Sequence, residues 1–119
     1  MKYNDLKPRT KQFALAIIRL VDDMPKNQGL SVIGKQILRS GTSVGANYRA
    51  ACRAKSVKDF IAKMGIVEEE IDETIYWLEL LEESGKLPTQ AVTEIAKEAN
   101  ELAAITVASI RTAKSRMEK

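Results

Sequence analysis

The side chains that most often carry out chemistry in proteins are nearly absent from this sequence. The chain has no histidine and a single cysteine, Cys52. Without histidine the usual general base, the Ser-His and Cys-His arrangements and most catalytic zinc sites are excluded, and one cysteine excludes a thiolate cluster. Neither GxxxxGK[ST] nor GxGxxG occurs, so the loops that cradle nucleotide phosphates are also absent. We therefore expect no enzymatic activity, no catalytic residue, no cofactor and no metal.

The densest group of carboxylates lies between Glu68 and Glu83, a stretch with eight acidic residues and no basic one. Its first five acids invite comparison with the di-metal centre of a helical bundle: Glu68, Glu69, Glu70, Asp72 and Glu73. Such a centre needs Glu-x-x-His pairs on inward faces. These acids have no histidine partner and fall mainly off the apolar stripe of their helix, so we interpret them as a solvated helix face.

A row of basic side chains is the strongest sign of a binding function. At 100° per residue, four bases fall in one narrow arc opposite the apolar stripe of their helix, with no acid among them: Lys35, Arg39, Arg49 and Arg53. We call this row the basic ridge. Such a row is often only a wetted surface, but its freedom from acids favours phosphate binding.

Charge is also divided unevenly along the chain. Residues 1–64 hold thirteen Lys/Arg and four Asp/Glu, whereas residues 65–119 hold six Lys/Arg and twelve Asp/Glu. Two interpretations remain open: antiparallel helices of opposite charge attract each other, or a basic face meets nucleic acid.

Two further residue types have a chemical and a structural interpretation. Trp77, beside Tyr76, is interpreted as a packing or interface anchor rather than a base-stacking platform. Cys52 is interpreted as a small packing residue rather than a nucleophile, because no histidine lowers its pKa.

The elements that position these side chains are four helices in one domain, residues 1–119. Apolar residues recur at gaps of three and four over about 9–24, 30–54, 57–84 and 90–116, and no stretch alternates with a period of two. The predicted buried stripe of the third helix runs from Val57 to Leu81, and that of the fourth runs from Val92 to Met117. Ser56 and Asp59 predict a helix start, and Gly85 predicts the end of the same helix. Because the connections are short, the sequence predicts an all-α, up-down-up-down antiparallel four-helix bundle.

Some residues do not suit an isolated bundle. Three glycines interrupt the second helix, Gly34, Gly41 and Gly45, so this helix needs tertiary support. The stretch from Ser40 to Gly45 predicts either a bend or the close approach of a neighbouring backbone. Five large apolar residues lie away from the main stripes and predict an oligomer interface: Leu15, Ile18, Ile66, Trp77 and Leu80.

The sequence also bears on the compartment. It shows neither a long apolar run nor a signal-peptide pattern, and a lone cysteine suits a reducing environment. We expect a cytoplasmic protein without a membrane partner.

Residues 39–81, RSGTSVGANYRAACRAKSVKDFIAKMGIVEEEIDETIYWLELL, resemble a known family. This is the small bacterial "four helix bundle protein" family, first known from reading frames in intervening sequences of 23S rRNA genes. The resemblance rests on Arg39 with the run from Ser43 to Arg49, on Ser56, Asp59, Phe60 and Lys63, and on Glu73, Thr74, Tyr76, Trp77, Leu78 and Leu81. It extends over roughly residues 10–115 and is specific for the family, not for an activity.

The resemblance implies more than the pattern does. It implies a homopentameric ring, and the chain is similar to accessory proteins of diversity-generating retroelements, which bind RNA or DNA and a reverse transcriptase. It assigns nucleic-acid contacts to Arg39, Arg49 and Lys63, to which the helical wheel adds Lys35 and Arg53. One departure is Ala50, where that subgroup generally has Glu.

We therefore favour a non-enzymatic oligomeric bundle that binds nucleic acid electrostatically, as an accessory ribonucleoprotein factor. The alternative is a protein interaction scaffold, in which the basic side contacts an acidic protein or the chain's own acidic third helix.

Overall fold

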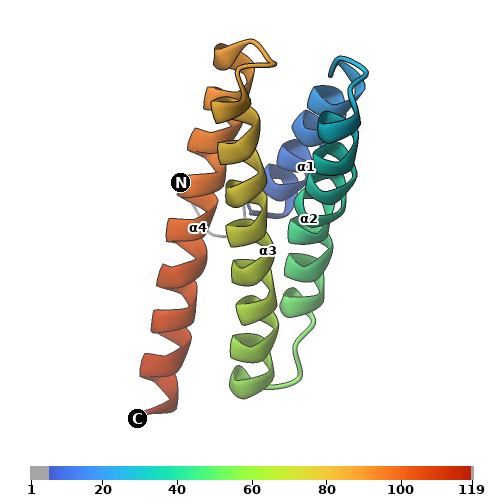
Figure 1. The fold of residues 1–119 in the computed structure, drawn as a ribbon. Coiled ribbons are helices and arrows are strands. Elements are labelled where there is room, and N and C mark those ends of the chain that lie inside the picture. The colour runs from blue at the N-terminus through green and yellow to red at the C-terminus, as the bar shows by residue number, and fades with distance from the viewer. Residues whose placement is uncertain (1–5, 119) are drawn as a thin grey trace.

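The structure, a computed structural model, describes residues 6–118, which form four antiparallel helices (Figure 1). They are α1 (Leu6–Asp22), α2 (Gln28–Cys52), α3 (Val57–Ser84) and α4 (Thr89–Met117). No strand occurs within this described range. The expected all-α four-helix architecture is confirmed, and helix ends differ from the expected positions by three residues at most. The largest difference is at the start of α1, where Pro8 lies inside the first turn and its missing N–H leaves no hydrogen bond unmade.

The helices form a narrow bundle of 52 × 21 × 21 Å in which consecutive helices are neighbours. The α2–α3 and α3–α4 interfaces are the most extensive and the α1–α4 interface is much smaller, while α1 and α3 lie at diagonal corners. α1 has 17 residues against 25 to 29 in the others. Consequently α2, α3 and α4 extend beyond the start of α1, and the end of the bundle at the α2–α3 connection has three helices (Figure 1).

The predicted apolar stripes form the core except at this three-helix end. From Met64 to Leu81, the stripe of α3 is buried at every position. Val57, predicted to belong to it, is 41 % exposed, and Met117 at the end of α4 is also exposed. Both residues lie at the end where the described part of the chain provides no fourth helix, which explains why the predicted pattern fails there.

Close packing explains the glycines of α2. A Cβ atom on Gly41 would lie 2.9 Å from Cγ1 of Ile17 in α1, and one on Gly45 would lie 3.2 Å from the hydroxyl of Thr10. Gly34 similarly faces Met24. Of the two predictions made for this part of α2, the structure confirms the close approach of a neighbouring helix, and α2 continues as one helix through all three positions.

Local caps mark the start of α3 and two other helix ends. The hydroxyl of Ser56 accepts a hydrogen bond from the backbone N–H of Asp59 at 3.0 Å, and the Asp59 carboxylate accepts one from the N–H of Lys55 at 3.1 Å. Gly85 ends α3 in the left-handed region with φ of 68°. The cap of α2 was not predicted: the side chain of Asn27 accepts a hydrogen bond from the N–H of Leu30 at 3.2 Å.

A polar pair lies inside the core between α2 and α3. The hydroxyl of Thr74 donates to that of Ser40 at 2.8 Å, and both residues are fully buried. We expect Thr74→Val to lower the free energy of unfolding by about 1–3 kcal/mol, because it leaves the Ser40 hydroxyl without its interhelical partner. Urea unfolding at fixed protein concentration measures the change.

The matched control for this substitution is Thr106→Val. The hydroxyl of Thr106 is equally buried but bonds only to the carbonyl of Leu102 in its own helix. We expect a smaller loss there, and a partial recovery when Ser40→Ala is added to Thr74→Val. Equal losses at Thr74 and Thr106 would show that the interhelical bond contributes nothing.

Candidate nucleic-acid interface

All four residues of the basic ridge are exposed, three of them in α2 and Arg53 at its C-cap, but they differ in their partners. Arg39 forms ion pairs with Glu70, at 3.3 Å, and with Glu73, both from α3. Lys63, the fifth predicted contact, forms an ion pair with Asp59 one turn earlier in α3, at 2.7 Å. Three members of the ridge form no ion pair with any residue of the range 6–118: Lys35, Arg49 and Arg53.

The pairing of Arg39 follows from the position of the acidic side of α3 next to α2. Hydrogen bonds from the Arg39 guanidinium, and then from the indole N–H of Trp77 at 3.0 Å, hold the pKa of Glu73 below its usual range. The same contact with Glu73 raises the pKa of Arg39. Two carboxylates therefore surround one guanidinium, and the middle of the ridge offers little positive charge to a phosphate.

Unpaired positive charge is instead concentrated at the three-helix end. Its two segments, residues 49–63 and 108–118, together hold eight Lys/Arg and two Asp/Glu, and of these eight cations only Lys63 forms an ion pair within residues 6–118. We call this surface the basic end. It combines Arg49 and Arg53 of the ridge with three bases from the last turns of α4, and Figure 1 shows the α2–α3 connection and the C-terminus of α4 at the same end of the bundle. These α4 bases are Arg111, Lys114 and Arg116.

The opposite end of the bundle has the opposite balance of charge. Residues 19–27 and 79–94, around the other two connections, hold six Asp/Glu and three Lys/Arg. Between the two ends, Arg9 joins α1 to α4 through Glu98 at 2.6 Å and Glu101 at 2.8 Å. The unequal charge of the two sequence halves thus becomes, in the fold, a difference between the two ends.

The three basic residues of α4 were not predicted as site residues. Two features of the sequence could have identified these residues. The segment from Arg111 to Arg116 contains no acid, and the predicted helix order is antiparallel. In an up-down-up-down bundle the C-terminal ends of the second and fourth helices lie together. The basic ridge was sought on one helix alone, so this second contribution was missed.

The interior offers no comparable cluster of reactive groups. Residues 6–118 contain no group of three or more Cys, Asp or Glu side chains arranged to hold a metal ion. Cys52 is exposed, unlike the packing residue that was predicted, and its thiol contacts the hydroxyl of Tyr48 one turn earlier. Burial, followed by this contact, raises the pKa of Tyr48 to about 12.

The residues predicted to form an oligomer interface lie on the diagonal helices α1 and α3. Ile18 of α1 is 37 % exposed and Ile66 of α3 is 44 % exposed, while Leu15, Trp77 and Leu80 are half-buried. The chain therefore carries two separate apolar surfaces. Within residues 6–118, no helix combines the length and the hydropathy that a membrane span requires.

Together, these features define an antiparallel four-helix bundle whose two ends carry opposite charge. The chain belongs to the 23S rRNA-intervening sequence protein family, whose model matches residues 3–108. This confirms the resemblance found in the sequence.

A solved structure agrees with this assignment. It is described as a protein with unknown function from the S23 ribosomal protein family of Bacteroides thetaiotaomicron, and it is 38 % identical to this chain with a TM-score of 0.81. The similarity covers 87 % of this chain and 96 % of the other. No curated protein matches this sequence. Neither the family description nor the solved relative names an enzymatic activity.

Proposed function

We propose that this protein is a non-enzymatic, oligomeric bundle that binds RNA or DNA electrostatically in the cytoplasm. The observation that carries the proposal is the basic end, where eight Lys/Arg from three helix ends and one connection meet only two acids. Exposed bases that lack intramolecular partners release counterions from nucleic acid when they bind phosphates, and this release drives sequence-independent affinity. The description of the family, which concerns an intervening sequence of rRNA, supports a role close to RNA.

We assign phosphate contacts to the ridge residues that form no ion pair within residues 6–118, not to the whole predicted ridge. Arg49 and Arg53 remain assigned to phosphate binding, and Lys35 adds a base farther along α2. Arg39 and Lys63 are each held by carboxylates of α3. Binding through these two residues would first have to break their ion pairs, so we assign them a secondary role.

Self-association is part of the proposal because it multiplies the basic end. The apolar surfaces of α1 and α3 are different and lie at diagonal corners, an arrangement that suits head-to-tail contacts in a closed ring. Several copies of one basic surface bind a polyanion more tightly than a single copy does. Light scattering behind a sizing column should give a multiple of the chain mass of 13.2 kDa, and a monomeric mass would contradict this part of the proposal.

The alternative scaffold function is favoured by one contact. At Arg39 the basic side of α2 does meet the chain's own acidic third helix, through Glu70 and Glu73. This contact lies in the middle of the ridge and leaves the basic end unneutralised. A protein partner that remains bound after nuclease treatment would favour the scaffold function.

A titration in rising salt tests the nucleic-acid function. We expect fluorescence anisotropy of a labelled oligonucleotide to show binding at about 50 mM salt, with a log-log slope near −0.9 per phosphate neutralised on duplex DNA and about −0.7 on a single strand. Competition by unlabelled strands of unrelated sequence should be equally effective. Absence of binding at low salt, or an affinity independent of salt, would reject the function.

A further inference from the structure

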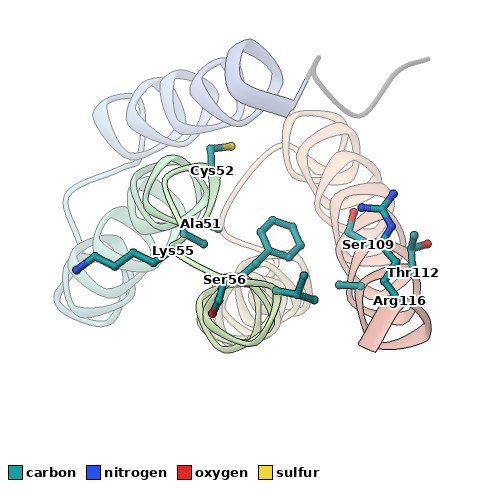
Figure 2. Close-up of a pocket in the computed structure, with 11 residues that line it drawn as sticks. Ala51, Cys52, Lys55, Ser56, Ser109, Thr112 and Arg116 are labelled. Carbon is teal, nitrogen blue, oxygen red and sulfur yellow. The ribbon is translucent and has the colours of Figure 1, made fainter. Parts of the chain in front are cut away.

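A groove opens at the centre of the basic end, where α1 does not cover the other three helices. Its volume is about 470 Å³, and it lies between the end of α2, the start of α3 and the last turns of α4. Figure 2 shows Ser109, Thr112 and Arg116 along the α4 wall, with Ala51 and Ser56 across the groove. Pockets of about 300–1,000 Å³ take ligands of small-molecule size, so the groove suits a single nucleotide rather than a helix of a partner protein.

The groove has an apolar part and a polar wall. The apolar part includes Ala51, Val57, Phe60 and Ala113. Ala51 and Ala113 are buried, but Phe60 is only half-buried and Val57 is exposed, so residues 6–118 leave part of this apolar surface uncovered. An aromatic ring beside aliphatic groups provides a face on which any nucleobase can stack.

The polar wall complements the other parts of a nucleotide. The hydroxyls of Ser109 and Thr112 donate and accept hydrogen bonds, so they suit the edges of any base without selecting one. The guanidinium of Arg116 provides a bidentate contact for a phosphate. Lys55 also lines the groove, and its side chain points away from α4 in Figure 2.

We infer that this groove binds one unpaired nucleotide of a single strand, with the base against Phe60 and a phosphate on Arg116. The inference rests on the proposed nucleic-acid function and specifies its substrate. A single anionic lipid would contact the apolar surface and one cation. A strand also places its other phosphates on the remaining Lys and Arg side chains of the basic end. A duplex is excluded from the groove because its bases are paired and stacked.

The experiment compares three labelled probes of equal length with the full chain: a single strand, its duplex, and an abasic strand with the same number of phosphates. We expect the single strand to bind about 5- to 100-fold more tightly than the abasic strand, which is the range of stacking on an aromatic side chain. Phe60→Leu should remove this preference and leave the salt slope unchanged. Ser109→Met fills the groove from the α4 wall and should have the same effect if Phe60→Leu impairs folding.

Failure of the inference and failure of the proposed function give different results. Equal affinity for the single strand and the abasic strand, with an ordinary salt slope for both, would overturn the inference and leave the proposed function standing. Retention of the preference in folded Ser109→Met would also overturn it. If none of the three probes binds at low salt, both the inference and the proposed function are wrong.

Discussion

Replacing Arg53, Arg111 and Lys114 with glutamine should lower the affinity for a single strand about 100-fold or more at about 50 mM salt. These residues come from the α2–α3 connection and from α4, and they form no ion pair within residues 6–118. Each lost phosphate contact removes about 0.7 from the log-log salt slope, so the slope should fall by about 2. Anisotropy titrations at several salt concentrations measure both quantities.

The matched control removes the same charge from the other end of the bundle. Arg19, Lys26 and Lys86 lie in α1 and in the two connections of the acidic end, and their replacement by glutamine changes the net charge equally. We expect this control to reduce the affinity far less, because the strand does not contact that end. Similar losses in the two variants would mean that only net charge matters and that the basic end is not a binding surface.

A third variant separates the basic end from the ridge as predicted. Arg39→Gln removes a base from the middle of the ridge, but this guanidinium is already held by Glu70 and Glu73. We expect little change in affinity, whether Arg39→Gln is made alone or together with the basic-end variant. If Arg39→Gln lowered the affinity as much as Arg53→Gln does, the whole predicted ridge would be the binding surface. The strand would then displace the carboxylates of α3 from Arg39.

The fold could be predicted from the sequence because helical periodicity, caps and short connections all indicate the same bundle. The stripe from Met64 to Leu81, the cap at Ser56 and the stop at Gly85 are local signals that no distant residue overrides. Val57 was misplaced because its position in the stripe is helical but the helix that would cover it is too short. Burial at a bundle end depends on the relative lengths of several helices. The apolar periodicity of one helix gives no information about those lengths.

The candidate site could be predicted only in part, for a similar reason. A helical wheel identified Arg49 and Arg53 correctly as exposed bases, because exposure depends mainly on the helix itself. It placed Arg39 with them because a wheel of one helix carries no information about the acids of its neighbour. Arg111 and Lys114 required the ends of the second and fourth helices to be considered together. Electrostatic sites are properties of a surface, and a surface is made by elements distant in sequence.

Gly41→Val should lower the free energy of unfolding by about 3 kcal/mol, a large share of the stability of a domain of this size. A Cβ atom at Gly41 would already lie 2.9 Å and 3.1 Å from two carbons of Ile17, which is completely buried. The added side chain would have to push α1 away from α2 along an interface that Gly34 and Gly45 also keep close. Urea unfolding followed by circular dichroism, at fixed protein concentration, measures the loss.

The control for Gly41→Val is the same substitution at Gly65. Gly65 lies inside α3 with no atom within 4 Å of its expected Cβ position, so valine there should stabilise the helix by a few tenths of a kcal/mol. Combining Gly41→Val with Ile17→Ala should recover part of the loss, because alanine removes the two carbons that the new side chain meets. If Gly41→Val and Gly65→Val had the same effect, or if Ile17→Ala only added its own cost, close contact between α1 and α2 would not be the reason for glycine at this position. The two substitutions should change the free energy of unfolding in opposite directions, because a side chain at Gly41 meets Ile17 and a side chain at Gly65 meets no atom within 4 Å.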